Sequence, residues 1–244
     1  MRRLLIVAVV LAGLLLVREW TTSRNMERER RAIVGARARL HDGIFRAVIL
    51  GDSVARGAGD ERGNGIADAL AAELRITGRA VAPVTNLGID GARTATVRKV
   101  LEATTAERAV RAADVIVLSI GGNDLYGSTP LRLVSRLLPA MQQHRTLWSI
   151  GRIVGRLRQL NPAARIYILG LYNPYRESSL GPWLARQVNL WDARLIMRFS
   201  SEPAVTVVRI CDLLAIEGRI SAIDRFHPGS AGYREIARRI AASI

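Results

Sequence analysis

The sequence contains few of the residue types on which several protein classes depend. Cys211 is its only cysteine, Lys99 is its only lysine, and only 5% of its residues are aromatic. A single cysteine excludes an internal disulfide and any metal site built from several cysteines. We find no metal-ligand spacing and no cofactor-binding signature, so we expect a protein that uses no cofactor.

Acidic residues are also scarce compared with basic ones. The chain has 36 Lys and Arg against 21 Asp and Glu, a formal net charge of +15 at pH 7. Such an excess is typical of nucleic-acid binding when a recognition motif accompanies it. Here the arginines are scattered and no RNA-binding or zinc-finger signature occurs, so we expect no nucleic-acid partner. Attraction to an anionic membrane surface fits this distribution better.

The chain has no apolar run of the usual transmembrane length, which is about 20 residues. Residues 4–17 are apolar or small and follow two arginines, as in the first regions of a secretory signal. The following residues could extend this run to a membrane interface if their charged side chains reach the headgroups. No small-x-small cleavage site follows. We therefore predict a single membrane anchor at residues 1–23, with secretion after cleavage as the alternative.

Residues 24–45 interleave arginine with glutamate and are helix-prone, which is typical of a juxtamembrane spacer and not of a core. The folded domain is then expected to occupy residues 46–244. At this length and with 49% hydrophobic residues, the chain can bury one sizeable core. The sequence gives no indication of the oligomeric state.

Strand-like and helix-like segments alternate from residue 46 onward. Apolar runs predict strands at 47–50, 81–86, 115–120, 166–171 and 205–210. Helical patterns predict helices at 65–76, 94–112, 131–160 with a break at Pro139, 182–199 and 230–242. Five β–α units in series predict an α/β fold, a doubly wound three-layer α/β/α sandwich with a five-stranded parallel sheet, as in flavodoxin-like folds. In the common strand order 2-1-3-4-5 the first three strands are neighbours.

Four short polar motifs follow predicted strands or precede the last helix. Each has an ordinary interpretation by itself, because aspartate and serine cap turns and glycine forms them. The carboxyl ends of parallel strands line one crevice, however, so these loops are expected to meet there. The four motifs are Gly51-Asp52-Ser53, Asn86 to Gly91, Gly121 to Asp124, and Asp224-x-x-His227-Pro228.

Together these motifs resemble the SGNH, or GDSL-type, esterase and lipase family over most of residues 46–244. The resemblance implies that Ser53 is the nucleophile and His227 its general base. It implies that Asp224 orients His227 and stabilises the imidazolium. Gly-x-Ser-x-Gly does not surround Ser53, which argues against the nucleophile elbow of α/β-hydrolases. Residues 57–65 lack Gly-Lys-Ser/Thr, which argues against a phosphate-binding P-loop.

The resemblance also implies an oxyanion hole. Its donors would be the backbone N–H groups of Ser53 and Gly91 and the side-chain amide of Asn123. Gly91, and not Gly88, matches the family's glycine because it stands five residues after Asn86.

The predicted function is serine-dependent hydrolysis of carboxylic esters, either lipid esters or esters of acylated carbohydrates. One alternative is an acyltransferase that uses the same residues on cell-envelope carbohydrate. Another is a catalytically silent, membrane-tethered binding domain, which the complete set of motif residues argues against. The family resemblance favours a catalytic domain outside the cytoplasm.

Apolar residues are frequent in residues 125–150, after the third motif. Two interpretations of this segment stay open: a lid that binds the acyl chain or faces a membrane, and an ordinary amphipathic helix packed on the sheet.

Overall fold

The computed structural model describes residues 43–63, 65–127 and 140–244. The predicted anchor and residues 24–42 of the predicted spacer lie outside this described part. Within the described ranges, no helix combines the length and the apolar character needed to cross a membrane. The first strand, β1 (Ile44–Phe45), pairs in parallel with β3 (Ala80–Val81), so the last two residues of the predicted spacer belong to a strand.

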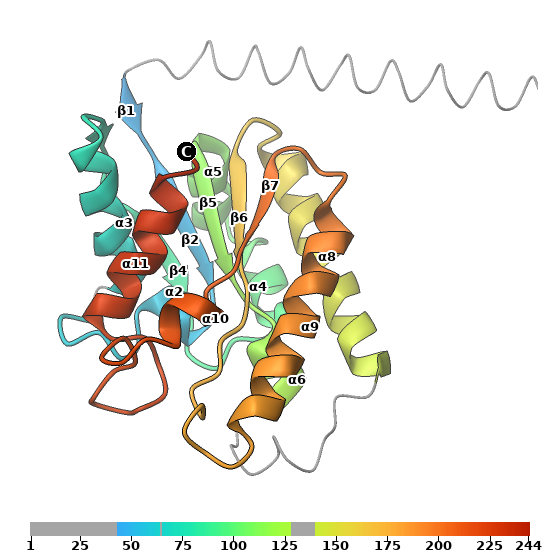
Figure 1. The fold of residues 1–244 in the computed structure, drawn as a ribbon. Coiled ribbons are helices and arrows are strands. Elements are labelled where there is room, and N and C mark those ends of the chain that lie inside the picture. The colour runs from blue at the N-terminus through green and yellow to red at the C-terminus, as the bar shows by residue number, and fades with distance from the viewer. Residues whose placement is uncertain (1–42, 64, 128–139) are drawn as a thin grey trace, which may run out of the picture. The chain divides into compact units, whose positions relative to one another are not determined.

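Five parallel strands form the central sheet (Figure 1). If these strands are numbered along the chain, their order across the sheet is 2-1-3-4-5, the common order of doubly wound sheets. This arrangement confirms the predicted α/β fold class. The central strand, β5 (Val115–Ser119), is largely apolar and completely buried, as expected for a parallel strand covered on both faces. Across the sheet the strands are β4 (Thr85–Gly88), β2 (Ala47–Gly51), β5 (Val115–Ser119), β6 (Arg165–Leu169) and β7 (Val205–Val208).

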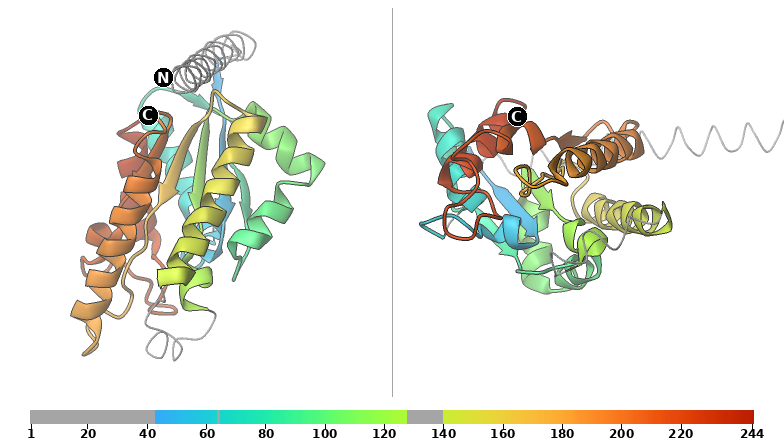
Figure 2. Two further views of the ribbon diagram at one scale, coloured as in Figure 1. Left: turned by 90° about the vertical axis from the view of Figure 1, so that its right-hand side faces the viewer. Right: turned by 60° about the horizontal axis from the view of Figure 1, so that its bottom comes forward.

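Helices cover both faces of this sheet (Figure 2). One face is covered by α3 (Gly65–Ile76), α10 (Cys211–Leu214) and α11 (Ser230–Ala241). The other face is covered by α4 (Thr94–Val100), α5 (Thr104–Ala112), α8 (Ala140–Leu160) and α9 (Gly181–Phe199). Two short helices, α2 (Ser53–Arg56) and α6 (Gly122–Tyr126), begin directly beyond the ends of β2 and β5.

Two predicted elements differ from the structure. The predicted helix 94–112 is divided into α4 and α5, because a straight helix would place Leu101 and Val110 on opposite sides, whereas both are buried in the same core. The predicted strand 81–86 is also divided: Val81 pairs in β3, and β4 begins only at Thr85. Pro83 lies between them and cannot donate a backbone hydrogen bond to a strand ladder.

The described part of the segment 125–150 favours its second interpretation. Helix α8 begins at Ala140 and packs against the sheet through Ile150, Ile153 and Leu157, as an amphipathic helix does. Residues 128–139 lie outside the described residues, so the lid hypothesis stays a prediction for them.

A buried carboxyl on α9 ties this helix to the end of β6. Asp192 Oδ1 accepts a hydrogen bond from the Leu171 N–H at 3.1 Å, and Gly170 leaves the room, since a Cβ there would lie 2.5 Å from that oxygen. Asp192 Oδ2 has no hydrogen-bond donor among the described residues and lies 3.8 Å from Arg209 Nε. Burial raises the pKa of Asp192 to about 6, and the Leu171 N–H and Arg209 offset only part of that effect.

This raised pKa predicts a pH-dependent loss of stability. Because ionisation is harder in the folded state, the contribution of Asp192 is fully present below the ordinary pKa of 3.8 and is lost as the pH rises through about 6. From about pH 4 to about pH 7, the free energy of unfolding of an Asp192→Asn variant should rise by about 2 kcal/mol relative to the wild type. Urea unfolding at each pH measures this difference. An Asp68→Asn variant removes the same charge from an exposed position and is the control. The prediction is contradicted if the difference in free energy of unfolding between Asp192→Asn and the wild type does not change with pH.

Candidate active site

Ser53 stands at a tight turn between β2 and α2. Gly51 has φ +139°, and a Cβ at this position would lie 1.8 Å from the Ser119 carbonyl oxygen, so the turn requires glycine. The Asp52 carboxylate caps α2 by accepting the Val54 N–H at 3.1 Å and also accepts the Ser119 hydroxyl at 2.9 Å. With Asp52 turned inward, the next side chain, Ser53, lines an open cavity.

Asp52 is a functional-site residue to which the sequence analysis assigned no role. Burial raises its pKa to about 6, although hydrogen bonds from Ser119, Val54 and Ala55 act in the opposite direction. Its carboxyl joins the ends of β2 and β5 and does not form part of the contact with His227. Asp52 therefore positions the turn that carries Ser53.

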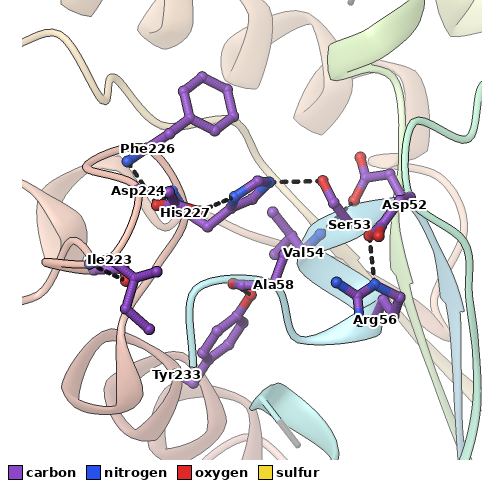
Figure 3. A network of polar contacts seen from close by, with 12 residues as sticks. Asp52, Ser53, Val54, Arg56, Ala58, Ile223, Asp224, Phe226, His227 and Tyr233 are labelled. Carbon is purple, nitrogen blue, oxygen red and sulfur yellow. Dashed lines mark hydrogen bonds and ion pairs between the residues drawn. The ribbon is translucent and has the colours of Figure 1, made fainter. Parts of the chain in front are cut away.

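A chain of hydrogen bonds links Ser53, His227 and Asp224 (Figure 3). His227 Nε2 lies 2.8 Å from Ser53 Oγ, and His227 Nδ1 lies 2.6 Å from Asp224 Oδ2. The other oxygen, Asp224 Oδ1, accepts the backbone N–H groups of Phe226 at 2.9 Å and His227 at 3.0 Å. Since a carboxylate only accepts, these contacts assign the ring proton to Nδ1 and leave Nε2 to accept the Ser53 hydroxyl proton.

The environment of Asp224 keeps this carboxyl ionised. Burial acts to raise its pKa, but hydrogen bonds from the His227 ring and from the two backbone N–H groups outweigh burial and lower the pKa below its usual value. The negative charge thus stays beside the imidazole at neutral pH.

The loop that carries His227 is held by contacts from three directions. Its own Ser221 N–H donates to the His227 carbonyl at 2.8 Å, and the Tyr172 hydroxyl donates to the Phe226 carbonyl at 2.9 Å. Gly59 packs so closely from the other side that a Cβ there would lie 2.7 Å from His227 Cβ. The Phe226 ring meets the imidazole edge-on, with centroids 4.9 Å apart. His227 is therefore fixed in position before any substrate binds.

The loops after β4 and β5 are joined to each other. Asn123 Nδ2 donates to the Ala92 carbonyl at 3.0 Å, and Asp124 accepts both the N–H of Thr94 at 3.0 Å and its hydroxyl at 2.6 Å. Gly91 lies in the same β4 loop with φ +68°. No described residue accepts a hydrogen bond from the backbone N–H of Ser53 or Gly91. Two backbone donors are thus left available beside the Asn123 amide.

The two glycines of the second motif have different surroundings. Gly88 packs against α2, where a Cβ would lie 2.2 Å from the Arg56 nitrogen, and Asn86 Nδ2 donates to the Ala55 carbonyl at 3.0 Å. A Cβ at Gly91, in contrast, would have no described atom within 4 Å, and Gly91 lines the cavity. Gly88 therefore serves close packing, whereas Gly91 faces the site.

All five residues singled out from the sequence (Ser53, Gly91, Asn123, Asp224 and His227) line one cavity of about 610 Å³. Its deeper wall is apolar and comes from the ends of β5, β6 and β7 and from α9, with Ile120, Leu169, Leu171, Leu184, Val188 and Ile210. Among the described residues, no three or more His, Cys, Asp or Glu side chains are grouped as a metal site would require.

Sequence reasoning missed the aromatic side chains beside His227. Tyr172, Tyr175 and Phe226 all line the cavity, and the Phe226 ring lies 6.5 Å from Tyr172 and 6.0 Å from Tyr175 between centroids. Their position was the available signal, because both tyrosines lie in the segment after β6, at the edge of the sheet where the motif loops meet.

The chain is similar to one family of known proteins and to a bacterial relative. The sequence model of the GDSL-like lipase/acylhydrolase family matches residues 49–235. The uncharacterized protein YpmR of Bacillus subtilis (strain 168) is 26% identical over 206 residues, which cover 80% of this chain and 79% of YpmR.

Two solved structures share the fold. The lipase Lip_vut3 from a goat rumen metagenome has a TM-score of 0.69 at 21% identity, over 82% of this chain and 97% of that chain. A catalytic mutant of Axe2, an acetylxylan esterase from Geobacillus stearothermophilus, has a TM-score of 0.60 at 16% identity, over 81% of this chain and 93% of that chain. Since the family match extends over most of the chain, the resemblance seen in the four motifs is confirmed: the chain belongs to the GDSL-like lipase/acylhydrolase family and is an SGNH-type carboxylic ester hydrolase.

Proposed function

We propose that this chain hydrolyses carboxylic esters with Ser53 as the nucleophile. The observation that supports this most directly is the continuous hydrogen-bond chain from Ser53 Oγ through His227 to Asp224. A hydroxyl with a base and a base with an orienting carboxylate are the parts that acyl transfer needs. Their common position on the wall of a cavity leaves room for an ester carbonyl next to Ser53.

In the proposed reaction, His227 Nε2 takes the hydroxyl proton while Ser53 Oγ attacks the carbonyl carbon. Asp224 stabilises the imidazolium that forms. When the tetrahedral intermediate collapses, the C–O bond to the alcohol breaks and His227 gives its proton to the leaving oxygen. Water then attacks the acyl-serine with His227 again acting as base, which releases the acid and restores Ser53.

The negative charge on the carbonyl oxygen needs donors that are already in place. The free N–H groups of Ser53 and Gly91 and the Nδ2 of Asn123 are proposed to supply them. Asn123 uses one of its amide hydrogens on the Ala92 carbonyl, which orients the other.

The apolar wall of the cavity supports a substrate with an acyl chain longer than acetyl. Each methylene that leaves water contributes about 0.8 kcal/mol, and the side chains from Ile120 to Ile210 offer an apolar surface for several of them. The alcohol portion would lie toward His227 and Phe226, because His227 must protonate the leaving oxygen. Lipid esters and long-chain esters of carbohydrates both meet these requirements.

The proposal places this activity at a membrane through residues 1–23, with the domain outside the cytoplasm. The described chain enters the domain at β1, at the amino-terminal edge of the sheet, whereas the motif loops lie at the carboxyl-terminal edge (Figure 1).

Replacing the nucleophile tests the proposal. Hydrolysis of p-nitrophenyl esters by a Ser53→Ala variant should fall by about 10⁴- to 10⁶-fold, because no other hydroxyl is activated by His227. A Ser200→Ala variant removes an exposed hydroxyl at the end of α9 and should keep full activity. Retained activity in Ser53→Ala, or none in a folded wild type, contradicts the proposal. Transfer to a sugar acceptor in excess of hydrolysis would instead indicate an acyltransferase.

The proposed role of Asn123 as an oxyanion donor is tested by measuring kcat and KM separately. An Asn123→Ala variant should lose about 10²- to 10³-fold in kcat with little change in KM, because the amide binds the oxyanion more strongly than the substrate carbonyl. Urea unfolding separately measures the stability lost with the hydrogen bond to Ala92. A change confined to KM would show that Asn123 is no oxyanion donor.

Chain-length preference tests the acyl pocket. The wild type should have a higher kcat/KM for p-nitrophenyl octanoate than for the acetate. Val188→Trp should lower that ratio about tenfold or more by filling the apolar end of the cavity. Ala193→Trp places the same indole side chain on the exposed side of α9 and is the control. A preference for acetate in the wild type argues against a long acyl chain.

A further inference from the structure

Helices α8 and α9 expose basic groups without any exposed acid between them. Helix α8 contains no Asp or Glu, and the only acidic residue of α9, Asp192, is buried. Arg156 of α8 forms an ion pair with Glu107 of α5, whereas the five exposed arginines of these two helices form none with a described carboxylate. They are Arg145 and Arg152 on α8 and Arg186, Arg194 and Arg198 on α9.

The opposite helical layer lacks this imbalance. Arg238 of α11 lies 2.9 Å from Glu235 and 3.8 Å from Glu73 of α3, and Arg239 forms a 2.7 Å ion pair with Asp212. Acidic partners thus neutralise basic groups on that side. Exposed basic groups without acidic partners are therefore a feature of α8 and α9 that the opposite layer lacks.

Large apolar side chains lie among these arginines. Trp148 is 55% exposed, Leu190 is 47% exposed and Met197 is 71% exposed, and the Arg152 guanidinium lies 4.9 Å from the centre of the Trp148 ring. The two helices pack side by side on the same layer, as Figure 2 shows in its left view. We call this basic and apolar surface the α8–α9 outer face.

We infer that the α8–α9 outer face docks onto an anionic lipid bilayer. Interfacial helices combine arginines, which bind lipid phosphates, with tryptophan and aliphatic side chains that enter the headgroup region. At 21 residues, α8 offers a contact about 30 Å long. The phosphates of a nucleic acid would pair with the arginines, but a nucleic acid would leave Leu190 and Met197 without an apolar partner.

The docked orientation would place the bilayer next to the cavity. The deep wall of the cavity includes Leu184 and Val188, which lie in the N-terminal half of α9, on the side of that helix opposite its exposed stripe. A bilayer against the outer face would thus lie one helix away from the acyl pocket. The inference does not depend on the chemistry of Ser53, and it is separate from the predicted anchor.

Residues 42–244 provide the material for the test because they lack the predicted anchor. They form one compact unit with an apolar core on each face of the sheet. The structural match to Lip_vut3 covers 97% of that chain, so a domain of this fold needs no further segment. We therefore expect residues 42–244 to fold without the preceding residues. Circular dichroism and cooperative urea unfolding verify each variant, so the outcome is independent of esterase activity.

The measurement is cosedimentation with vesicles of phosphatidylcholine alone and with equal parts of phosphatidylglycerol. Binding should require phosphatidylglycerol. It should weaken about 10- to 100-fold in the Arg145→Gln/Arg152→Gln/Arg194→Gln triple variant. The matched Arg62→Gln/Arg75→Gln/Arg234→Gln variant removes three exposed arginines elsewhere and should change binding less than about threefold. Trp148→Ser should weaken binding several-fold without changing the charge.

Three outcomes would overturn the inference. If the two triple variants lose vesicle binding equally, binding depends on the total charge of the protein and not on the α8–α9 outer face. Absence of vesicle binding by the folded wild type would exclude a bilayer as the partner. Binding of an oligonucleotide through the same three arginines, with no vesicle binding, would assign the face to nucleic acid instead.

Discussion

The arrangement of the site depends on one buried carboxyl, that of Asp52. It accepts the Ser119 hydroxyl from the neighbouring strand and the Val54 N–H from the helix that follows, and so joins β2, β5 and α2 at one point. Burial of this carboxyl is costly, which its raised pKa of about 6 reflects. Together, Gly51 and Asp52 fix the turn after β2, and this turn places the Ser53 side chain in the cavity wall. The short helix α2 has too few residues to be stable without this cap.

The other segments of the site are held by polar side chains from different elements. Asp124 holds Thr94, and Asn86 holds the end of α2 through the Ala55 carbonyl. Tyr172 holds the loop of His227, which is 174 residues away from Ser53 in the sequence. Reciprocal contacts of this kind fix the donors and the base before a substrate arrives, and fixed donors are the ones that lower a transition-state barrier. The same polar loops leave the apolar wall of the cavity to α9 and the strand ends.

The two helical layers serve different purposes. The layer of α3 and α11 packs on the sheet through one apolar core and carries ion pairs on its surface. Its Tyr233 hydroxyl donates to the Ala58 carbonyl beneath the His227 loop. The layer of α8 and α9 builds one wall of the cavity with its inner side and carries unpaired positive charge on its outer side. An apolar pocket and a basic, partly apolar outer surface on the same helix pair are what an enzyme needs if its ester substrates reside in or beside an anionic bilayer.

The sequence by itself determined the elements that depend on local pattern. Apolar runs located four of the five strands of the sheet, and helical spacing predicted the bounds of α3. The motif residues from Ser53 to His227 were identified in segments that the structure brings together. Only the tertiary structure decided which groups meet. The partnership of Asp52 with Ser119, the break between α4 and α5, the buried Asp192 and the aromatic side chains around His227 all depend on neighbours distant in the chain. Periodicity indicates that a face is buried or exposed, but it carries no information about what packs against that face, because such contacts form only when the sheet is assembled.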